Sequence, residues 1–409
     1  MKRRFVAVGF ALWMGVGGLE GASSGTRAGG PALPPAVPRA ELDAAFRQLL
    51  KDLPVVGIGA GIVKGDRLVW SGAYGMADID EPRAVAASTI FHMGSVSKTL
   101  TAAALIRLWQ DGRFQLDDDI NRYLSFPIRN PRFPDRPITF RMLLTHTSSI
   151  SEIFQQPGRD KLPNLYGSKD PVIGLGDIVR EFLVPGGQYY WDFNYRDAAP
   201  GTRYEYANVG FALIGHLIER ISGTSFHEYC GTHLLKPLDM RDSTYRLSNT
   251  KLERFAYPYW PDPADPGHMT RIAPFTWAGY TDGSLRTTVP DYGHFLVMVL
   301  NRGRYRGRQV MKPETVATWL APQEIPGMPP ARGIIQRDDY ALGWPVHRLK
   351  GEVAYLHNGS GTGFGTYVYF VPSLMIGGMI FVTGQPAPQD LFPRLEQLIG
   401  LMVDVSGRF

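Results

Sequence analysis

Ser95 and Lys98 are the residues whose types and spacing first suggest chemistry. The apolar residues and alanines from Ser95 to Trp109 are typical of a buried helix, and Gly112 suits the end of that helix. Ser95 is therefore expected at a helix N-terminus with Lys98 one turn further on, about 5–6 Å away at Cβ. The helix terminus would also offer free N–H groups and a partial positive charge to a developing oxyanion. The pair predicts a serine nucleophile activated by a neighbouring lysine.

A serine and a lysine three positions apart also arise by chance in a chain of this length. Ser248 and Lys251 have the same spacing, but they lie between turn-forming residues and no apolar helix follows them. Nothing in that stretch would hold the lysine against the serine. The assignment of Ser95 therefore depends on further motifs.

The second motif is Tyr206-Ala207-Asn208, directly before a predicted helix over 209–221. Tyr206 would lie in extended backbone and point to the same side as Asn208. A phenol near Lys98 would have a lowered pKa and could carry protons to and from Ser95. The alternatives are structural: a packed aromatic ring at Tyr206, and a helix N-cap at Asn208.

The third motif is His357-Asn358-Gly359-Ser360, after a short predicted strand. Glycines beside a sheet edge allow a ligand to approach the backbone closely. A strand at this place could align a substrate and donate an N–H to its carbonyl oxygen. The alternative is a glycine-rich hairpin without a function.

Together, in this order, the three motifs resemble those of the serine β-lactamase and penicillin-binding-protein superfamily, and most of all its class C-like branch. The family's Ser-x-x-Lys matches Ser95 and Lys98, its Tyr-x-Asn matches Tyr206 and Asn208, and its Lys-Thr-Gly, often His-x-Gly in this branch, begins at His357. The resemblance continues through three further stretches and so covers nearly the whole chain: 145–148, 237–240 and 342–344.

The resemblance implies a role for each site residue. Ser95 would attack a carbonyl carbon, while Lys98 and Tyr206 would handle its proton as a coupled pair, with the true base left open. The backbone N–H groups of Ser95 and Ser360 would form the oxyanion hole. Asn208 would hold Lys98 and the acyl group in position. The third motif, from His357 through Asn358 to Gly359, would line the leaving-group side.

Two residues depart from the family pattern. Ser149 stands where the family usually has glycine, which bears on the shape of that loop. His357 replaces a lysine, so a fixed positive charge gives way to a side chain that is mostly neutral at pH 7, with an ordinary pKa of about 6.5. We therefore expect weaker binding of carboxylate-bearing β-lactams.

The sequence thus predicts a serine hydrolase that forms an acyl-enzyme on an ester or a peptide-like amide, as carboxylesterases and D-amino-acid peptidases do. One alternative is a class C-like β-lactamase, a D-Ala-D-Ala carboxypeptidase or an acyl transferase. Another is a catalytically inactive binding or sensor protein on the same scaffold. An α/β-hydrolase is not supported, because Gly-x-Ser-x-Gly occurs only at 21–25.

The chain has 409 residues, of which 44% are hydrophobic and 20% charged, as in ordinary globular proteins. A net charge of +5 without an arginine cluster among aromatics does not predict nucleic-acid binding. Cys230 is the single cysteine, so no intramolecular disulfide forms and a buried thiol is expected. The histidines are scattered, and neither a metal nor a cofactor is expected. The partner would be a small ester, amide or short peptide.

Residues 1–24 have the layout of a secretory signal. Lys2-Arg3-Arg4 precedes an apolar run from Phe5 to Leu19 and the small residues at 21–24. This predicts a periplasmic or secreted protein with no stable membrane span once the signal is removed, or an anchored one if the signal is not cleaved. The cleavage site and the oligomeric state are left open.

The elements that would position the site predict a mixed α/β fold. After a flexible leader over 25–38, a helix is expected over 39–53 and strands over 55–63 and 67–74. Near the other end, strands over 354–356, 365–371 and 375–383 precede a helix over 389–403. An antiparallel sheet built from both termini is therefore expected, flanked by helices. The serine hydrolase domain would span 39–409, with an α/β lobe at 39–115 and 264–409 and an all-helical lobe at 116–263.

Overall fold

The computed structural model describes residues 38–151, 166–262, 265–327, 336–384 and 388–409. The predicted secretory signal over 1–24 lies outside these residues. So does the predicted leader over 25–38, except for Pro38, which begins the first helix. None of the helices in the described part of the chain is both long enough and apolar enough to cross a membrane.

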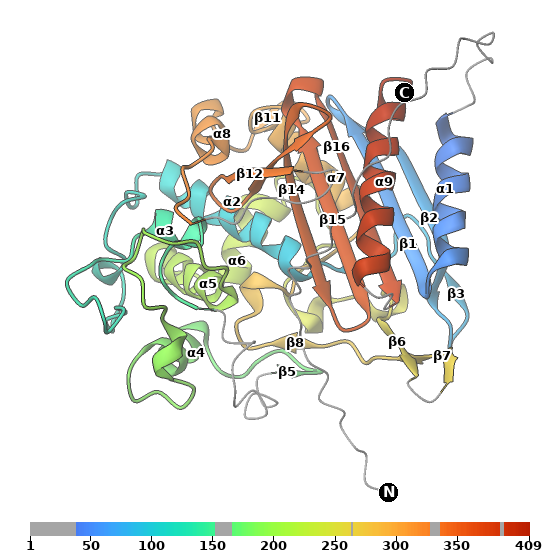
Figure 1. The fold of residues 1–409 in the computed structure, drawn as a ribbon. Helices are drawn as coiled ribbons and strands as arrows, with labels where there is room; N and C mark the ends of the chain where they lie inside the picture. Colours follow the sequence, from blue (N-terminus) through green and yellow to red (C-terminus); the bar gives the residue numbers. More distant parts are fainter. Residues whose placement is uncertain (1–37, 152–165, 263–264, 328–335, 385–387) are drawn as a thin grey trace, which may run out of the picture.

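An eight-stranded sheet forms the centre of the molecule (Figure 1), and its strands come from both ends of the chain. Every neighbouring pair of strands is antiparallel. This confirms the predicted fold class. In sheet order the strands are β12 (Gln336–Tyr340), β13 (Pro345–Leu349), β14 (Glu352–Gly361), β15 (Phe364–Val371), β16 (Ile376–Gly384), β1 (Val55–Lys64), β2 (Arg67–Asp78) and β3 (Arg83–Ala84).

Two helices from opposite ends of the chain cover one face of the sheet (Figure 1). They are α1 (Pro38–Asp52) and α9 (Pro388–Ser406), and they contact each other as well as β1. Phe46 of α1 stacks on the rings of Trp70 and Tyr74 in β2. The apolar residues whose spacing predicted this helix therefore form the face of α1 that packs against the sheet.

The opposite face is covered by α7 (Val289–Leu300), which packs against β1, β2 and β16. The side chain of Thr288 caps this helix by accepting a hydrogen bond from the backbone N–H of Asp291, and Pro290 lies in the first turn. Thr288 and Pro290 are therefore the residues that fix the start of this helix.

The remaining helices lie on the side of α7. They are α2 (Ser97–Gln110), α3 (Phe140–Leu144), α4 (Leu175–Leu183), α5 (Asn208–Ser222), α6 (Phe226–Cys230) and α8 (Pro313–Leu320). The long helix α5 packs against α2 and ends at Gly223, whose φ of +76° favours glycine. Cys230, at the end of α6, is buried, and burial raises the pKa of its thiol.

Short two-stranded pairs connect these helices to the sheet. They are β4 (Phe91–His92) with β9 (Arg286–Thr287), β5 (Tyr166–Gly167) with β8 (Thr276–Trp277), β6 (Tyr259–Asp262) with β7 (Asp265–Arg271), and β10 (Arg304–Tyr305) with β11 (Arg308–Gln309). In the aromatic-rich loop over 186–200, Tyr189 and Tyr195 are buried, so at least these two rings belong to the core.

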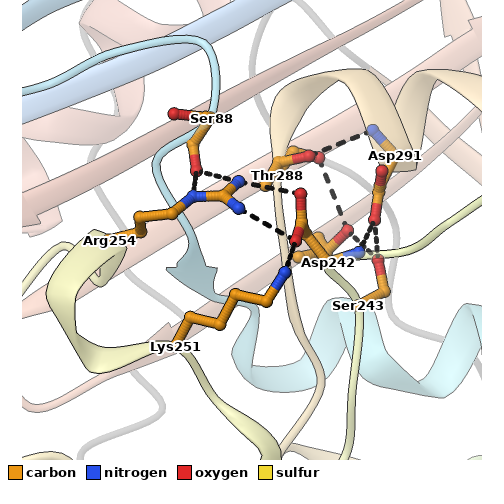
Figure 2. Close-up of polar contacts among 8 residues, drawn as sticks. Ser88, Asp242, Ser243, Lys251, Arg254, Thr288 and Asp291 are labelled. Carbon is orange, nitrogen blue, oxygen red and sulfur yellow. Dashed lines mark hydrogen bonds and ion pairs between the residues drawn. The ribbon is translucent and has the colours of Figure 1, made fainter.

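A polar network fastens the segment that leads to β4 (Figure 2). Arg254 donates to both carboxylate oxygens of Asp242, at 3.0 and 2.8 Å, and to the backbone oxygen of Ser88. Lys251 donates to the same carboxylate at 2.7 Å. The backbone N–H of Asp242 donates in turn to Asp291 in α7 at 2.8 Å. The network therefore ties three separate parts of the chain together.

We expect Asp242→Asn to lower the free energy of unfolding by about 1–2 kcal/mol at pH 7, because charge-assisted hydrogen bonds are lost. The hydrogen bond from Arg254 is the largest influence that lowers the pKa of Asp242. A lowered folded-state pKa gives stability that is present above the unfolded value of about 3.9 and is lost as the pH falls through the folded value. The difference between wild type and variant should therefore shrink towards pH ~3. Urea unfolding at both pH values measures this, with the exposed Asp66→Asn as control. An equal difference at both pH values would contradict it.

Candidate active site

Ser95 lies between a strand and a helix. It is the middle residue of a 3₁₀ turn, Gly94–Val96, which follows β4 and runs into α2. The sequence predicted Ser95 at the N-terminus of the helix, and the α-helix begins two residues later, at Ser97. The turn requires glycine at position 94, because φ is +51° and a Cβ atom would lie 2.9 Å from the backbone N of Ser360.

Lys98 reaches Ser95 as the sequence predicted. Its Nζ donates to Ser95 Oγ at 3.1 Å, to Asn208 Oδ1 at 2.6 Å and to the backbone oxygen of Asp282 at 2.9 Å. The lysine side chain is fully buried. Its amine is therefore fixed against the hydroxyl by contacts from two other segments.

The second motif lies at the start of α5. Lys98 Nζ is 5.1 Å from the centre of the Tyr206 ring, so the phenol lies beside the Ser95–Lys98 pair. The N-cap of α5 is Ala207, without a side-chain cap, and Asn208 is the first helical residue. The alternative of Asn208 as an N-cap is therefore wrong, because its side-chain oxygen accepts a hydrogen bond from Lys98.

His146 holds the backbone on both sides of Tyr206. Its Nδ1 accepts a hydrogen bond from the N–H of Ala207 at 3.2 Å, and its carbonyl oxygen accepts one from the N–H of Glu205 at 2.7 Å. Its ring lies 4.4 Å from the Tyr206 ring, centre to centre. The sequence analysis placed His146 only within a stretch of family resemblance and did not assign it a role at the site.

The third motif lies inside β14 rather than after a strand as predicted. Gly359 packs directly on the segment that carries the serine: a Cβ atom there would lie 2.2 Å from the oxygen of Met93 and 2.9 Å from the backbone N of Ser95. Thr366, in the neighbouring strand β15, donates to the same Met93 oxygen at 2.8 Å. The backbone N of Ser360 is close to Gly94, so both predicted oxyanion donors lie in one region.

The strand alternation separates the residues of this motif. His357 and Gly359 face the side of Ser95, because side chains two residues apart share a face. Asn358 stands opposite Tyr367 in β15, and their side chains are hydrogen-bonded on the other face, where Tyr367 packs against Phe392 of α9. The structure therefore does not bring the side chain of Asn358 to the candidate site.

His357 is buried and uncharged. Its Nδ1 is 2.7 Å from the backbone oxygen of Asn358, which can only accept, so Nδ1 carries the proton. Burial and the positive charge of Lys98 lower the pKa of His357 to about 3. In the neutral ring Nε2 is an acceptor, and this atom has no hydrogen-bond partner among the described residues.

The loop after α3 explains the departure at Ser149. This residue has a φ of +64°, a left-handed conformation that favours glycine and costs a serine about 1–2 kcal/mol. Its Oγ accepts a hydrogen bond from Asn130 at 3.1 Å. The loop therefore keeps a glycine-like conformation with serine in place.

The second Ser-x-x-Lys sequence does not form a site. Lys251 binds Asp242 (Figure 2), and the Oγ of Ser248 donates to Asp170. Each side chain is therefore held by a different carboxylate. Within the described ranges no group of three or more His, Cys, Asp or Glu side chains is arranged to hold a metal ion.

A serine whose hydroxyl meets a buried amine, with a phenol beside it and two backbone N–H groups nearby, has the parts of a serine acyl-transfer centre. The chain belongs to the Beta-lactamase family, whose model matches residues 42–399. Members of this family are generally serine hydrolases. This confirms the resemblance inferred from the three motifs.

Similarity to individual proteins is distant. Protein flp of Staphylococcus aureus (strain MW2) is 23% identical over 341 residues, which are 82% of this chain and 61% of that protein. The chain thus spans about three fifths of that relative's length. A structure of a β-lactamase/D-alanine carboxypeptidase from Pseudomonas syringae has a TM-score of 0.67 at 18% identity, over 90% of this chain and 99% of that one. An octameric penicillin-binding protein homologue from Pyrococcus abyssi has a TM-score of 0.66 at 22% identity, over 90% and 77%. These likenesses show the shared fold.

Proposed function

We propose that the protein is a serine hydrolase that forms an acyl-enzyme at Ser95 with an ester or a peptide-like amide. The observation that carries this proposal is the hydrogen bond of 3.1 Å between Lys98 Nζ and Ser95 Oγ. Ser95 Oγ would bond to the substrate carbonyl carbon as its proton passes to the Lys98–Tyr206 pair. The leaving group would depart with a proton from that pair, and water would then release the acyl group.

The neutral His357 supports esters and amides over carboxylate-bearing β-lactams. A carboxylate needs a hydrogen-bond donor or a positive charge, and the neutral His357 offers neither, because its one N–H is bonded to the backbone oxygen of Asn358. An ester or amide without a carboxylate has no such requirement. The buried ring also stays neutral at every pH well above its lowered pKa of about 3.

A second candidate is β-lactamase or D-alanine carboxypeptidase activity. It is favoured by the likeness to the structure of the Pseudomonas syringae β-lactamase/D-alanine carboxypeptidase. The two candidates share the nucleophile and differ in what the leaving-group side accepts.

The test compares kcat/KM for p-nitrophenyl acetate, D-alanine p-nitroanilide and benzylpenicillin with purified protein. We expect kcat/KM for the ester or the amide to exceed that for the penicillin by about 10- to 100-fold, since a charge-assisted contact worth about 1.5–3 kcal/mol is missing. His357→Lys should narrow this ratio, and His357→Leu, which adds neither a donor nor a charge, should preserve it. Comparable turnover of penicillin and ester would contradict the substrate class. Turnover no faster than that of Ser95→Ala for every substrate would contradict a hydrolase.

A further inference from the structure

The residue whose backbone oxygen binds Lys98 also carries a buried carboxyl group, which has no role in the chemistry proposed above. Asp282 ends the 3₁₀ turn Tyr280–Asp282 and is only 3% exposed. Its Oδ1 accepts a hydrogen bond of 2.6 Å from the indole N–H of Trp277. Its backbone oxygen accepts the bond from Lys98 Nζ at 2.9 Å. The residue that holds the amine therefore also carries an acid.

The contacts of Lys98 fit an ammonium ion. An ammonium group has three N–H donors and no acceptor, and Nζ meets acceptors on Ser95, Asn208 and Asp282. A fully buried ammonium is costly unless an opposite charge lies nearby. The carboxylate of Asp282 can supply that charge.

We propose that Asp282 is a positioning residue whose carboxylate keeps Lys98 in the ammonium form, so that the proton of Ser95 leaves to the phenolate of Tyr206. This rests on the proposed function, because it concerns the same nucleophile. The Oγ–H bond of Ser95 breaks, its electron pair forms the bond to the substrate carbonyl carbon, and the phenolate oxygen gains the proton. The ammonium of Lys98 keeps its three protons and stabilises the phenolate.

The titration of the surrounding groups supports a pH test. Burial raises the pKa of Asp282 to about 7, while the positive charge of Lys98 and the hydrogen bond from Trp277 oppose that rise. Two further titratable groups lie against Lys98, namely Tyr206 and His357. His357, with its pKa lowered to about 3, stays neutral throughout the assay range. Loss of activity on the acid side should therefore follow protonation of Asp282 or of the Tyr206 phenolate, and variants that change only Asp282 or its partner separate the two groups.

The test measures kcat/KM for a neutral ester from about pH 5 to 9 in wild type and Asp282→Asn. The wild type should lose activity as the pH falls through the raised pKa of Asp282, because the carboxylate is present only above it. Asp282→Asn keeps an oxygen for the Trp277 N–H and should lose this acid limb, with a plateau lower by about 10-fold or more. If Lys98 were instead the neutral base, removing the carboxylate would raise activity at low pH. That result, or an unchanged profile, would overturn the proposal.

A second variant guards against a folding effect. Trp277→Phe removes the donor that stabilises the Asp282 carboxylate, so its acid limb should move to higher pH while the plateau stays near that of wild type. A loss of stability alone would not remove the acid limb in Asp282→Asn and shift it to higher pH in Trp277→Phe. The rate of fluorophosphonate labelling of Ser95 gives the same profiles without any substrate. An unshifted limb in Trp277→Phe would also count against the proposal, even if the ester and amide substrates are confirmed.

Discussion

Ser95→Ala should no longer be labelled by a fluorophosphonate, and its turnover should fall by roughly 10⁴-fold or more. The probe bonds to an activated oxygen, and Ser95 Oγ is the hydroxyl that meets the buried amine of Lys98 at 3.1 Å. The variant removes that oxygen and little else, so the fold should remain. Intact-mass spectrometry measures the added mass, and a progress curve measures turnover.

Ser248→Ala is the matched control, because Ser248 is followed by Lys251 at the same spacing as Ser95 and Lys98. Lys251 donates to Asp242 (Figure 2), whereas Ser248 donates to Asp170, so the amine of Lys251 is not held against this serine. Labelling of this variant should equal that of wild type. Labelling that survives Ser95→Ala, or disappears in Ser248→Ala, would show that the nucleophile lies elsewhere.

Gly359→Ala should lower kcat/KM by about 100-fold or more, because a displacement of about 1 Å at a catalytic centre has effects of that size. The added methyl group would lie 2.2 Å from the oxygen of Met93 and 2.9 Å from the backbone N of Ser95. Both are backbone atoms and cannot rotate away. The strand would have to move off the serine-bearing turn, and with it the backbone N–H of Ser360, the proposed oxyanion donor. Steady-state kinetics and thermal unfolding measure the two effects separately.

Gly400→Ala in α9 is the control for that experiment. Apart from its chain neighbours and the backbone of its own helix, no atom of the described residues lies within 4 Å of the position of its added Cβ, and an alanine inside a helix stabilises by about 0.5–1 kcal/mol relative to glycine. Its activity should match wild type. If Gly359→Ala were as active as Gly400→Ala, the close contact between β14 and the Ser95 turn would not matter for catalysis.

The sequence allowed the fold to be predicted because its strands and helices have clear periodicity. The helix predicted over 209–221 corresponds to α5, Asn208–Ser222, and the helix predicted over 389–403 lies within α9, Pro388–Ser406. The fold class followed from strands at both chain ends. Ser95, Lys98, Tyr206 and Asn208 could be selected because the order of their motifs is specific, and the structure brings these four together.

The remainder of the site could not be predicted, because it depends on contacts between distant segments. Asn358 was predicted as a site residue only because it lies within the His-x-Gly motif. Its pairing with Tyr367 shows that its side chain faces α9 instead. Asp282 belongs to no motif, and its proximity to Lys98 arises from the packing of the 280–282 turn against α2. The role of His146 likewise depends on a hydrogen bond to a residue 61 positions away.

The contacts between distant parts of the chain also bear on when the proposed activity could first arise during synthesis. β1 pairs with β16, and the bond from Thr366 to the Met93 oxygen joins residues 273 positions apart. During synthesis Ser95 and Lys98 leave the ribosome long before the hairpin of β14 and β15 exists. Pairings this distant in sequence form late and slowly. The nascent polypeptide would therefore be unable to carry out the proposed acylation of Ser95 until that hairpin docks.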